Sequence, residues 1–263
     1  SGESNVWVKV PSIAASPTVT NIWMYYGNAL ATDAQSAAST WSNSFAKVIN
    51  FKGTAGNAIA NAATLTSSLG NNMVANNTGG AGMSYIAGMI NTAVQTDGLD
   101  DWIDIGADAS LNFTASTPFT FSGWVKATEN VGPFVSFRDS ASGAAMLEFG
   151  VGYNGATSVN GTANILVRDL SGNTYATYQG PVIYDGSWHL YSVSRNAGST
   201  ISLFIDGVFI GTTSSAGTGG NLTANMRALG SDRYWATISG GSPDQNYLAA
   251  GFDQFEISTV QRS

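Results

Sequence analysis

The sequence predicts an all-β fold, an antiparallel β-sandwich, and three observations support this prediction. From residue 101 onward, short apolar segments of strand length alternate with glycine, asparagine, aspartate or proline, a spacing that is typical of sandwiches. Asp206 and Gly207 stand between two such segments, and this pair favours a type I′ hairpin because both turn positions need positive φ. Helical periodicity is nearly absent over the same stretch, so helices are not expected there.

The N-terminal part of the chain predicts two strands joined by a turn. Val6, Val8 and Val10 alternate with larger side chains in VWVKVPSI, which is the period of a strand. A second apolar segment, TNIWMYYGN, follows a proline-containing turn. We therefore expect a β-hairpin extension within residues 1–30.

Residues 29–98 are mostly small and polar. Their first part could form a short helix, and the remainder predicts irregular loops with brief strands near residues 48–51 and 89–94. After these loops, the sequence predicts ten strands. In chain order they are DWIDIG, FTFSGWVKA, GPFVSFRD, AMLEFGVG, NILVRDL, TYATYQG, WHLYSVSR, TISLFIDG, VFIGTT and GFDQFEIS.

Several of these segments resemble a known family. DGLDDWIDIG, FTFSGWVKA, DGSWHLYSVSR, ISLFIDGVFIG and GFDQFEIS occur in the order expected of a LamG-like domain of the concanavalin A-like lectin/glucanase superfamily. The resemblance implies that residues 46–263 form a jelly roll of two curved antiparallel sheets. VWVKVPSIAASPTVTNIWMYYGN is similar to the end of a small extracellular domain of unknown function that precedes LamG-like domains in prokaryotic surface proteins. Residues 1–30 are then expected to be the C-terminal remnant of that domain, and residues 31–45 a linker.

The composition excludes several classes of partner. Acidic residues number 17 against 10 basic ones, for a net charge of −7, so no basic surface for nucleic acid is expected. Cysteine is absent, which excludes disulfides and thiolate metal sites. The longest apolar runs have only strand length, so no membrane insertion is expected. Scarce lysine and abundant serine, threonine, asparagine and glycine favour a secreted or cell-surface protein.

The single histidine, His189, could be a catalytic base or a core side chain. On a strand it shares a face with Tyr191 and Val193, which favours the structural role. Polysaccharide-cleaving members of the superfamily use clustered carboxylates, because retaining hydrolysis needs two of them about 5–5.5 Å apart. The glutamates here are not clustered, and the denser DGLDD group contains none. Asp253 and Glu256 are three positions apart and would face opposite sides of a strand, so we expect no enzymatic activity.

The resemblance also implies a structural calcium ion near the rim of the sandwich. Asp253 matches the final-strand aspartate that supplies a calcium ligand in the family. The early polar loop, commonly D-S-S-G-N, is TSSLGNN here, so Thr66 replaces the acid while Ser68 and Asn71 keep oxygen donors. Backbone carbonyls and a few carboxylates can complete the oxygen shell that calcium prefers. The alternative is that the Asp253 carboxylate binds backbone N–H groups at a strand end.

A candidate ligand site lies in residues 230–247, GSDRYWATISGGSPDQNY, which we expect to be a long polar loop. Sugar binding requires an aromatic surface for the apolar face of the ring and polar groups for its hydroxyls. The candidate ligand-binding residues are Asp232, Arg233, Tyr234, Trp235 and Asp244. The alternative for Trp235 is that it anchors the loop on the sandwich.

Two hypotheses for the function follow. The first is a non-catalytic secreted or cell-surface binding module that recognises a polysaccharide, glycoconjugate or other surface ligand, as part of a larger lectin-like or adhesin-like protein. The second is a structural subunit of a filament, fibre or appendage that self-assembles when its N-terminal strands add to a neighbour's sheet. An aromatic rim on a monomer would favour the first hypothesis. An N-terminal hairpin docked on another copy would favour the second.

Overall fold

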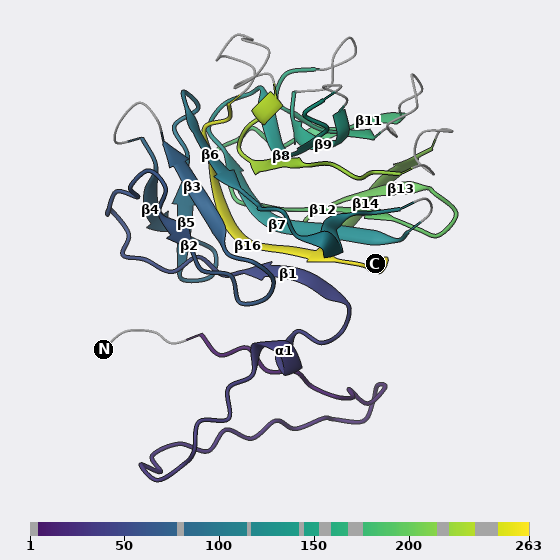
Figure 1. Ribbon diagram of the computed structural model, residues 1–263. Coiled ribbons are helices and arrows are strands. Elements are labelled where there is room, and N and C mark those ends of the chain that lie inside the picture. The colour runs from purple at the N-terminus through teal and green to yellow at the C-terminus, as the bar shows by residue number, and fades with distance from the viewer. Residues whose placement is uncertain are drawn as a thin grey trace.

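The structure, a computed structural model, consists of two packed antiparallel β-sheets (Figure 1). It describes residues 5–77, 82–114, 117–141, 145–152, 159–167, 176–214, 221–234 and 247–262. The first sheet has the strand order β14 (Val208–Thr213), β13 (Ile201–Ile205), β12 (His189–Arg195), β7 (Phe119–Ala127), β16 (Ala250–Ser258), β5 (Thr92–Gln95) and β4 (Ser84–Ala87), and β1 (Phe45–Ile49) also pairs with β16.

The second sheet has the order β11 (Ala176–Val182), β10 (Thr162–Val167), β9 (Ala145–Val151), β8 (Gly132–Arg138), β15 (Met226–Leu229), β6 (Asp101–Asp104), β3 (Met73–Asn77) and β2 (Thr64–Leu65). The short helical elements α1 (Ala37–Thr40) and η1 (Ala109–Leu111) accompany the strands. The predicted antiparallel sandwich is therefore confirmed. No helix in the described part of the chain is long and apolar enough to cross a membrane.

The core between the two sheets is built around a cluster of phenylalanines. The ring of Phe121 on β7 lies 5.3 Å, centre to centre, from the rings of Phe137 and Phe149 on the second sheet. Both pairs meet edge to face, an arrangement that the charge distribution of aromatic rings favours. Along most of β7 buried residues alternate with half-buried ones, because only one face of the strand packs against the second sheet.

The turn between β13 and β14 has the geometry that its sequence predicts. Asp206 has φ of 54° and Gly207 has φ of 75°, so both central residues occupy the left-handed region. This confirms the type I′ interpretation, because that turn matches the twist of the strands on either side.

The first strand of the sandwich pairs with the last. In the antiparallel β1–β16 pair, Phe45 lies opposite Ser258 and Ile49 lies opposite Phe255. The pairing continues past the strand ends, where the N–H of Thr259 donates to the carbonyl of Ser44. Residues far apart in the sequence thus close one side of the first sheet.

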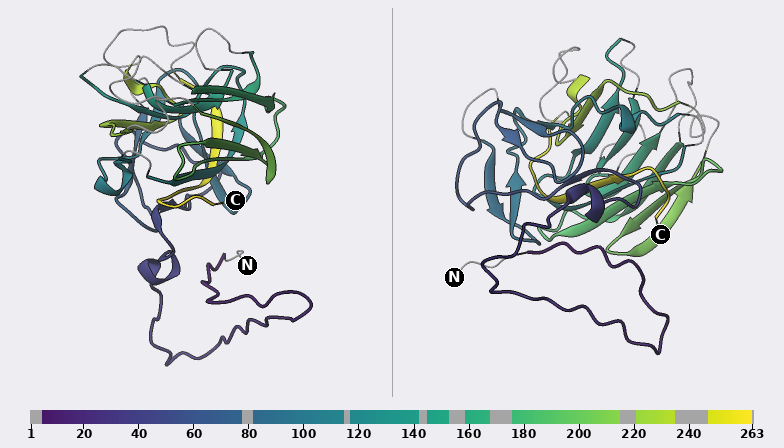
Figure 2. Two further views of the ribbon diagram at one scale, coloured as in Figure 1. Left: turned by 90° about the vertical axis from the view of Figure 1, so that its right-hand side faces the viewer. Right: turned by 60° about the horizontal axis from the view of Figure 1, so that its bottom comes forward.

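The N-terminal hairpin expected within residues 1–30 does not form in the described part of that range, because residues 5–36 contain no strand. Figures 1 and 2 show this N-terminal segment (residues 5–36) outside the two sheets. Its aromatic contact to the rest of the chain joins the rings of Trp7 and Trp41, 5.5 Å apart. Two strands without a third strand or a packing surface are only marginally stable, which explains the difference. The large apolar side chains exposed along the segment are Val6, Trp7, Val8, Ile13, Val19, Ile22, Trp23, Met24, Tyr25, Tyr26 and Leu30.

Candidate functional site

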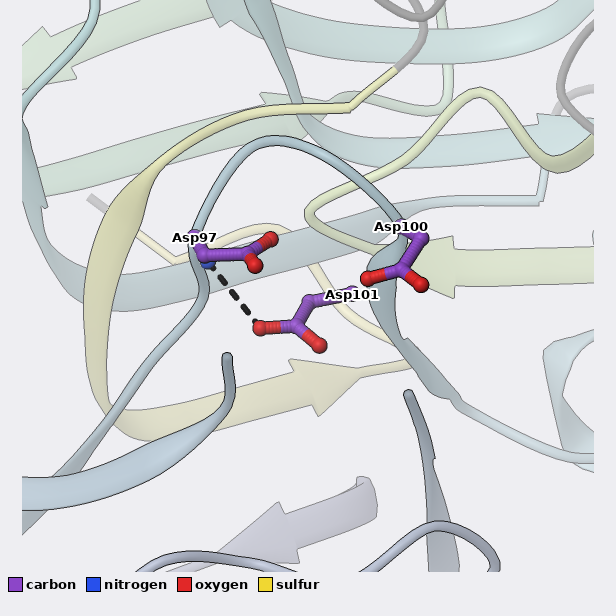
Figure 3. Close-up of side chains that lie close together, drawn as sticks. All are labelled: Asp97, Asp100 and Asp101. Carbon is purple, nitrogen blue, oxygen red and sulfur yellow. Dashed lines mark hydrogen bonds between the residues drawn. The ribbon is translucent and has the colours of Figure 1, made fainter. Parts of the chain in front are cut away.

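A dense group of carboxylates lies where β5 turns into β6, in the aspartate turn (residues 97–101). One carboxylate oxygen from each of Asp97, Asp100 and Asp101 lies within 4.8 Å of the other two. Figure 3 shows the Asp97 and Asp100 carboxylates facing each other, with the Asp101 carboxylate below them. Gly98 allows the turn because its φ is +81°, and the Asp97 side chain accepts the N–H of Leu99 at 2.8 Å.

The Asp101 carboxylate is buried without a cation beside it. Asp101 has 0% of its surface exposed, and its Oδ2 accepts the N–H of Asp97 at 3.0 Å, whereas its Oδ1 has no hydrogen-bond partner among the described residues. Burial, and after it the negative charge of Asp97, raise the pKa of Asp101 to about 7. Two like unit charges within 4.8 Å of each other repel by at least about 3.5 kcal/mol at an effective dielectric constant of about 20. The turn therefore favours a bound proton or a bound cation. These residues are not among the site residues expected from the sequence, although the spacing of the aspartates in DGLDD could have indicated a site.

The two carboxylates of β16 lie on the same face of the strand, not on opposite faces as their spacing predicts. Asp253 pairs with Trp124 and Glu256 with Ser122, because a β-bulge interrupts β16 between them. The Asp253 carboxylate accepts the N–H of Ile90 at 2.7 Å, and burial raises its pKa. Asp253 thus caps the β4–β5 turn with a backbone hydrogen bond, the alternative that the sequence left open.

The other two residues predicted to bind calcium contact β1 and its flank. The Ser68 hydroxyl accepts a hydrogen bond from the Asn50 side-chain amide at 3.1 Å. The Asn71 carbonyl accepts one from the ammonium group of Lys47, a residue with 0% exposure. Protein donors therefore already occupy oxygens on all three residues, which does not favour a cation bound there.

A buried charged network (Arg138, Glu148 and Asp232) holds the start of the 230–247 segment on the second sheet. The Arg138 guanidinium on β8 lies 2.8 Å from the Glu148 carboxylate on β9 and also contacts the Asp232 carboxylate. The Ser136 hydroxyl donates to Glu148 at 3.3 Å. One cation faces two carboxyl groups, and burial, followed by the charge of Asp232, raises the pKa of Glu148 to about 8. Asp232 itself has 0% exposure, so it supports the segment, a role that sequence analysis did not assign to it.

The next residues of the 230–247 segment contact strand β6 of the same sheet. Arg233 pairs with Asp104 of β6 at 3.0 Å and stacks 4.5 Å above the ring of Trp102, a favourable cation–π contact. Arg233 and Tyr234 are both partly exposed. At the other end of the segment, Tyr247 forms a bridge to residue 231. The remaining candidates for ligand binding, Trp235 and Asp244, lie outside the described residues.

His189 connects β12 to the β13–β14 hairpin. Its Nδ1 lies 2.8 Å from the Asp206 carboxylate and its Nε2 lies 3.2 Å from the Asp185 carboxylate. The Asp206 carboxylate also accepts the N–H of Leu190 at 2.8 Å. Burial lowers the pKa of His189, but the hydrogen bonds and charges of the two aspartates outweigh burial and raise that pKa above its ordinary value. This bridging geometry supports the structural interpretation of His189.

Comparisons with protein families give two matches along the chain. Residues 97–263 match a family model described as the concanavalin A-like lectin/glucanases superfamily. Residues 1–64 match a domain of unknown function, DUF2341. A search of curated proteins finds no match.

Solved structures with the same fold include bacterial toxin and enzyme domains. The binding domain of Paraclostridial Mosquitocidal Protein 1 superposes with a TM-score of 0.60 and 14% identity over 84% of this chain and 50% of that chain. The binding domain of botulinum neurotoxin serotype D/C superposes with a TM-score of 0.57 and 10% identity, over 84% of this chain and 50% of that chain. The third structure is domain 4 of AbnA, an extracellular arabinanase from Geobacillus stearothermophilus, solved with arabinotriose. It superposes with a TM-score of 0.50 and 14% identity, over 73% of this chain and 84% of that chain. The chain thus spans about half the length of the two toxin binding domains, and at these identities the likeness concerns the fold.

Proposed function

Because the chain belongs to the concanavalin A-like lectin/glucanases superfamily, we propose that it is a non-catalytic binding module of a secreted or cell-surface, adhesin-like protein. Its ligand is a polysaccharide or glycoconjugate. The proposal rests on one observation, the anchoring of residues 232 and 233, at the start of the 230–247 segment, by charged side chains. Asp232 is held by Arg138, and Arg233 is held by Asp104 and Trp102.

Such anchoring suits a segment that presents side chains to a ligand. A binding surface is most effective when its supporting residues are fixed before the ligand arrives. Tyr234 follows these anchors directly and is partly exposed, and Trp235 and Asp244 follow it in the sequence. In this proposal the two aromatic side chains contact the apolar face of a sugar ring, and polar groups bind its hydroxyls.

The test is a glycan array probed with the purified protein, in calcium and again in EDTA. Arabino-oligosaccharides are included because the arabinanase domain with this fold was solved with arabinotriose. The comparison of calcium with EDTA also tests whether binding needs the calcium ion that the family resemblance implies at Asp253, Ser68 and Asn71. We expect binding to a defined glycan that Trp235→Ala abolishes. A control, Phe209→Ala, removes an aromatic side chain that is 57% exposed on β14 and should bind normally. A folded protein that binds no glycan in either condition would contradict the proposal.

The second candidate function is a structural subunit that assembles through the N-terminal segment. The observation that favours it is the row of exposed apolar side chains there, with Trp23 77% and Tyr25 92% exposed. Contiguous exposed apolar surface of this kind often marks an interaction site. Sedimentation equilibrium tests this function: oligomers that dissociate on substituting Trp23 and Tyr25 with serine would support it, and a monomer at all concentrations would exclude it.

A further inference from the structure

We propose that the aspartate turn is a calcium-binding site, distinct from the ligand set implied by the family resemblance. The three side chains that bind the ion are those of Asp97, Asp100 and Asp101. Two independent features of the turn support this assignment: the convergence of its carboxylates, and a buried oxygen that no protein group satisfies.

The first feature is the convergence of three carboxylates within 4.8 Å. In the described residues, no ion pair to an arginine, lysine or histidine involves Asp97 or Asp101. The nearby Glu129 adds to the acidic surroundings, since a Cβ placed at Gly98 would lie 2.7 Å from its Oε2. The protein itself therefore leaves much of this negative charge without a salt bridge.

The second feature is the Oδ1 atom of Asp101. The residue has 0% exposure, and within the described part of the chain this oxygen has no hydrogen-bond partner. Buried polar atoms in folded proteins are almost always satisfied, and one that is not requires an explanation such as a bound ion. A cation bound beside the Asp101 carboxylate, which lies next to those of Asp97 and Asp100 in Figure 3, would satisfy this oxygen and reduce the repulsion at once.

The donor set selects the type of ion. All three side-chain donors are carboxylate oxygens, without histidine or cysteine, which disfavours zinc and suits a hard cation. Calcium tolerates irregular shells of oxygens, whereas magnesium demands near-ideal octahedral geometry. Three carboxylates at unequal spacing in one turn form an irregular set, so calcium is the ion we assign.

The backbone also approaches the carboxylates closely at one position. A Cβ built on Gly82 would lie 2.1 Å from the Asp97 Oδ2 and 2.9 Å from the Asp101 Oδ2. Any side chain at residue 82 would therefore push these carboxylates out of place. Gly82→Ala thus offers a way to disturb the site without removing a charge.

The test is calcium titration by isothermal calorimetry, combined with thermal unfolding in calcium and in EDTA. We expect the wild-type chain to bind one calcium ion in this turn and to unfold at a higher temperature in calcium. Asp101→Asn and Asp100→Asn should each weaken binding by at least about tenfold, because calcium affinity depends on the number of charged ligands. Gly82→Ala should weaken it too. The control Asp33→Asn removes a carboxylate from the exposed N-terminal segment and should bind as the wild type does.

Two further comparisons distinguish calcium binding in the aspartate turn from a loss of folding and from binding at Asp253. Asp101→Asn in EDTA should unfold at a temperature equal to or above that of the wild type in EDTA, because it removes a buried charge; this shows that lost binding does not reflect lost folding. Asp253→Asn should retain the calcium response of the aspartate turn. The proposal fails if the wild type shows neither binding heat nor a higher unfolding temperature, if Asp101→Asn binds like the wild type, or if Asp253→Asn alone abolishes binding.

Discussion

The buried charged network predicts a stability that depends on pH through a single side chain, Glu148. Burial and the charge of Asp232 raise the pKa of Glu148 from its ordinary 4.5 to about 8. The folded protein therefore holds this proton more tightly than the unfolded chain does. The resulting stabilisation is complete below about pH 4.5 and is lost as the pH rises through about 8. Glu148→Gln mimics the protonated form and should remove this dependence.

The size of the effect follows from the same pKa. One pKa unit corresponds to about 1.4 kcal/mol, so the rise to about 8 corresponds to about 5 kcal/mol across the full range. The assay is urea unfolding in EDTA at about pH 5, 7 and 9. The wild type should lose free energy of unfolding relative to Glu148→Gln as the pH rises, and the two proteins should differ most at about pH 9. The difference between them removes contributions from other titrating groups, such as Asp101.

Two results would refute this reasoning. Parallel pH profiles for the wild type and Glu148→Gln would mean that Glu148 is already ionised in the folded protein at low pH. A variant less stable than the wild type at about pH 9 would mean that the network requires the charge. Arg138→Met serves as the contrasting variant, since it removes the Arg138 guanidinium from the buried Glu148 and Asp232 carboxyl groups and should cost about 3–5 kcal/mol at neutral pH.

Three more predictions follow from other parts of the fold. Phe121→Ala should lower the free energy of unfolding by about 3–5 kcal/mol in urea titrations, because this ring contacts both sheets; a loss below about 1 kcal/mol would contradict its central place in the core. His189→Ala should cost at most about 1 kcal/mol at pH 5.5 and less at alkaline pH. The aspartates raise the His189 pKa, so its charge-dependent contribution is complete below the ordinary value of about 6.5 and disappears as the pH rises through the folded value; an equal cost at both pH values would exclude the charged pair. Deleting residues 1–36 should leave the thermal unfolding temperature nearly unchanged, because the described residues of that range are mostly exposed; a large drop would show that the segment packs on the sandwich.

Much of the fold could be predicted because each later strand is marked by its own local sequence pattern. All ten strands expected from residue 101 onward are present, and each combines apolar residues with turn residues at its ends. The sequence does not predict β3 and β15, nor the short end strands β2 and β4. The segments MVANN of β3 and MRAL of β15 are short and rich in asparagine, alanine or charge. Such segments become strands because neighbours on both sides supply hydrogen bonds, and propensity alone does not show those neighbours.

The candidate sites could be predicted less well, because they depend on contacts between distant residues. Sequence alone placed Asp232 and Arg233 together but could not show that Arg138 and Asp104 would hold them. The bulge that turns Asp253 and Glu256 to one face likewise has no clear sign in GFDQFEIS. In the aspartate turn, burial of Asp101 gives the carboxylates their significance, and burial depends on the packing of the whole sandwich.

The pairing of β1 with β16 determines how the sandwich would respond to mechanical tension. Phe45, where β1 begins, lies opposite Ser258, where β16 ends, so the chain enters and leaves the sandwich at the same end of this pair. A force that pulls residues 44 and 259 apart would load the hydrogen bonds between them one after another, beginning with the bond from Thr259 to Ser44. The hydrogen bonds of this pair would therefore break one at a time at low force. They would not resist the force together, as they do when two strands are pulled in shear.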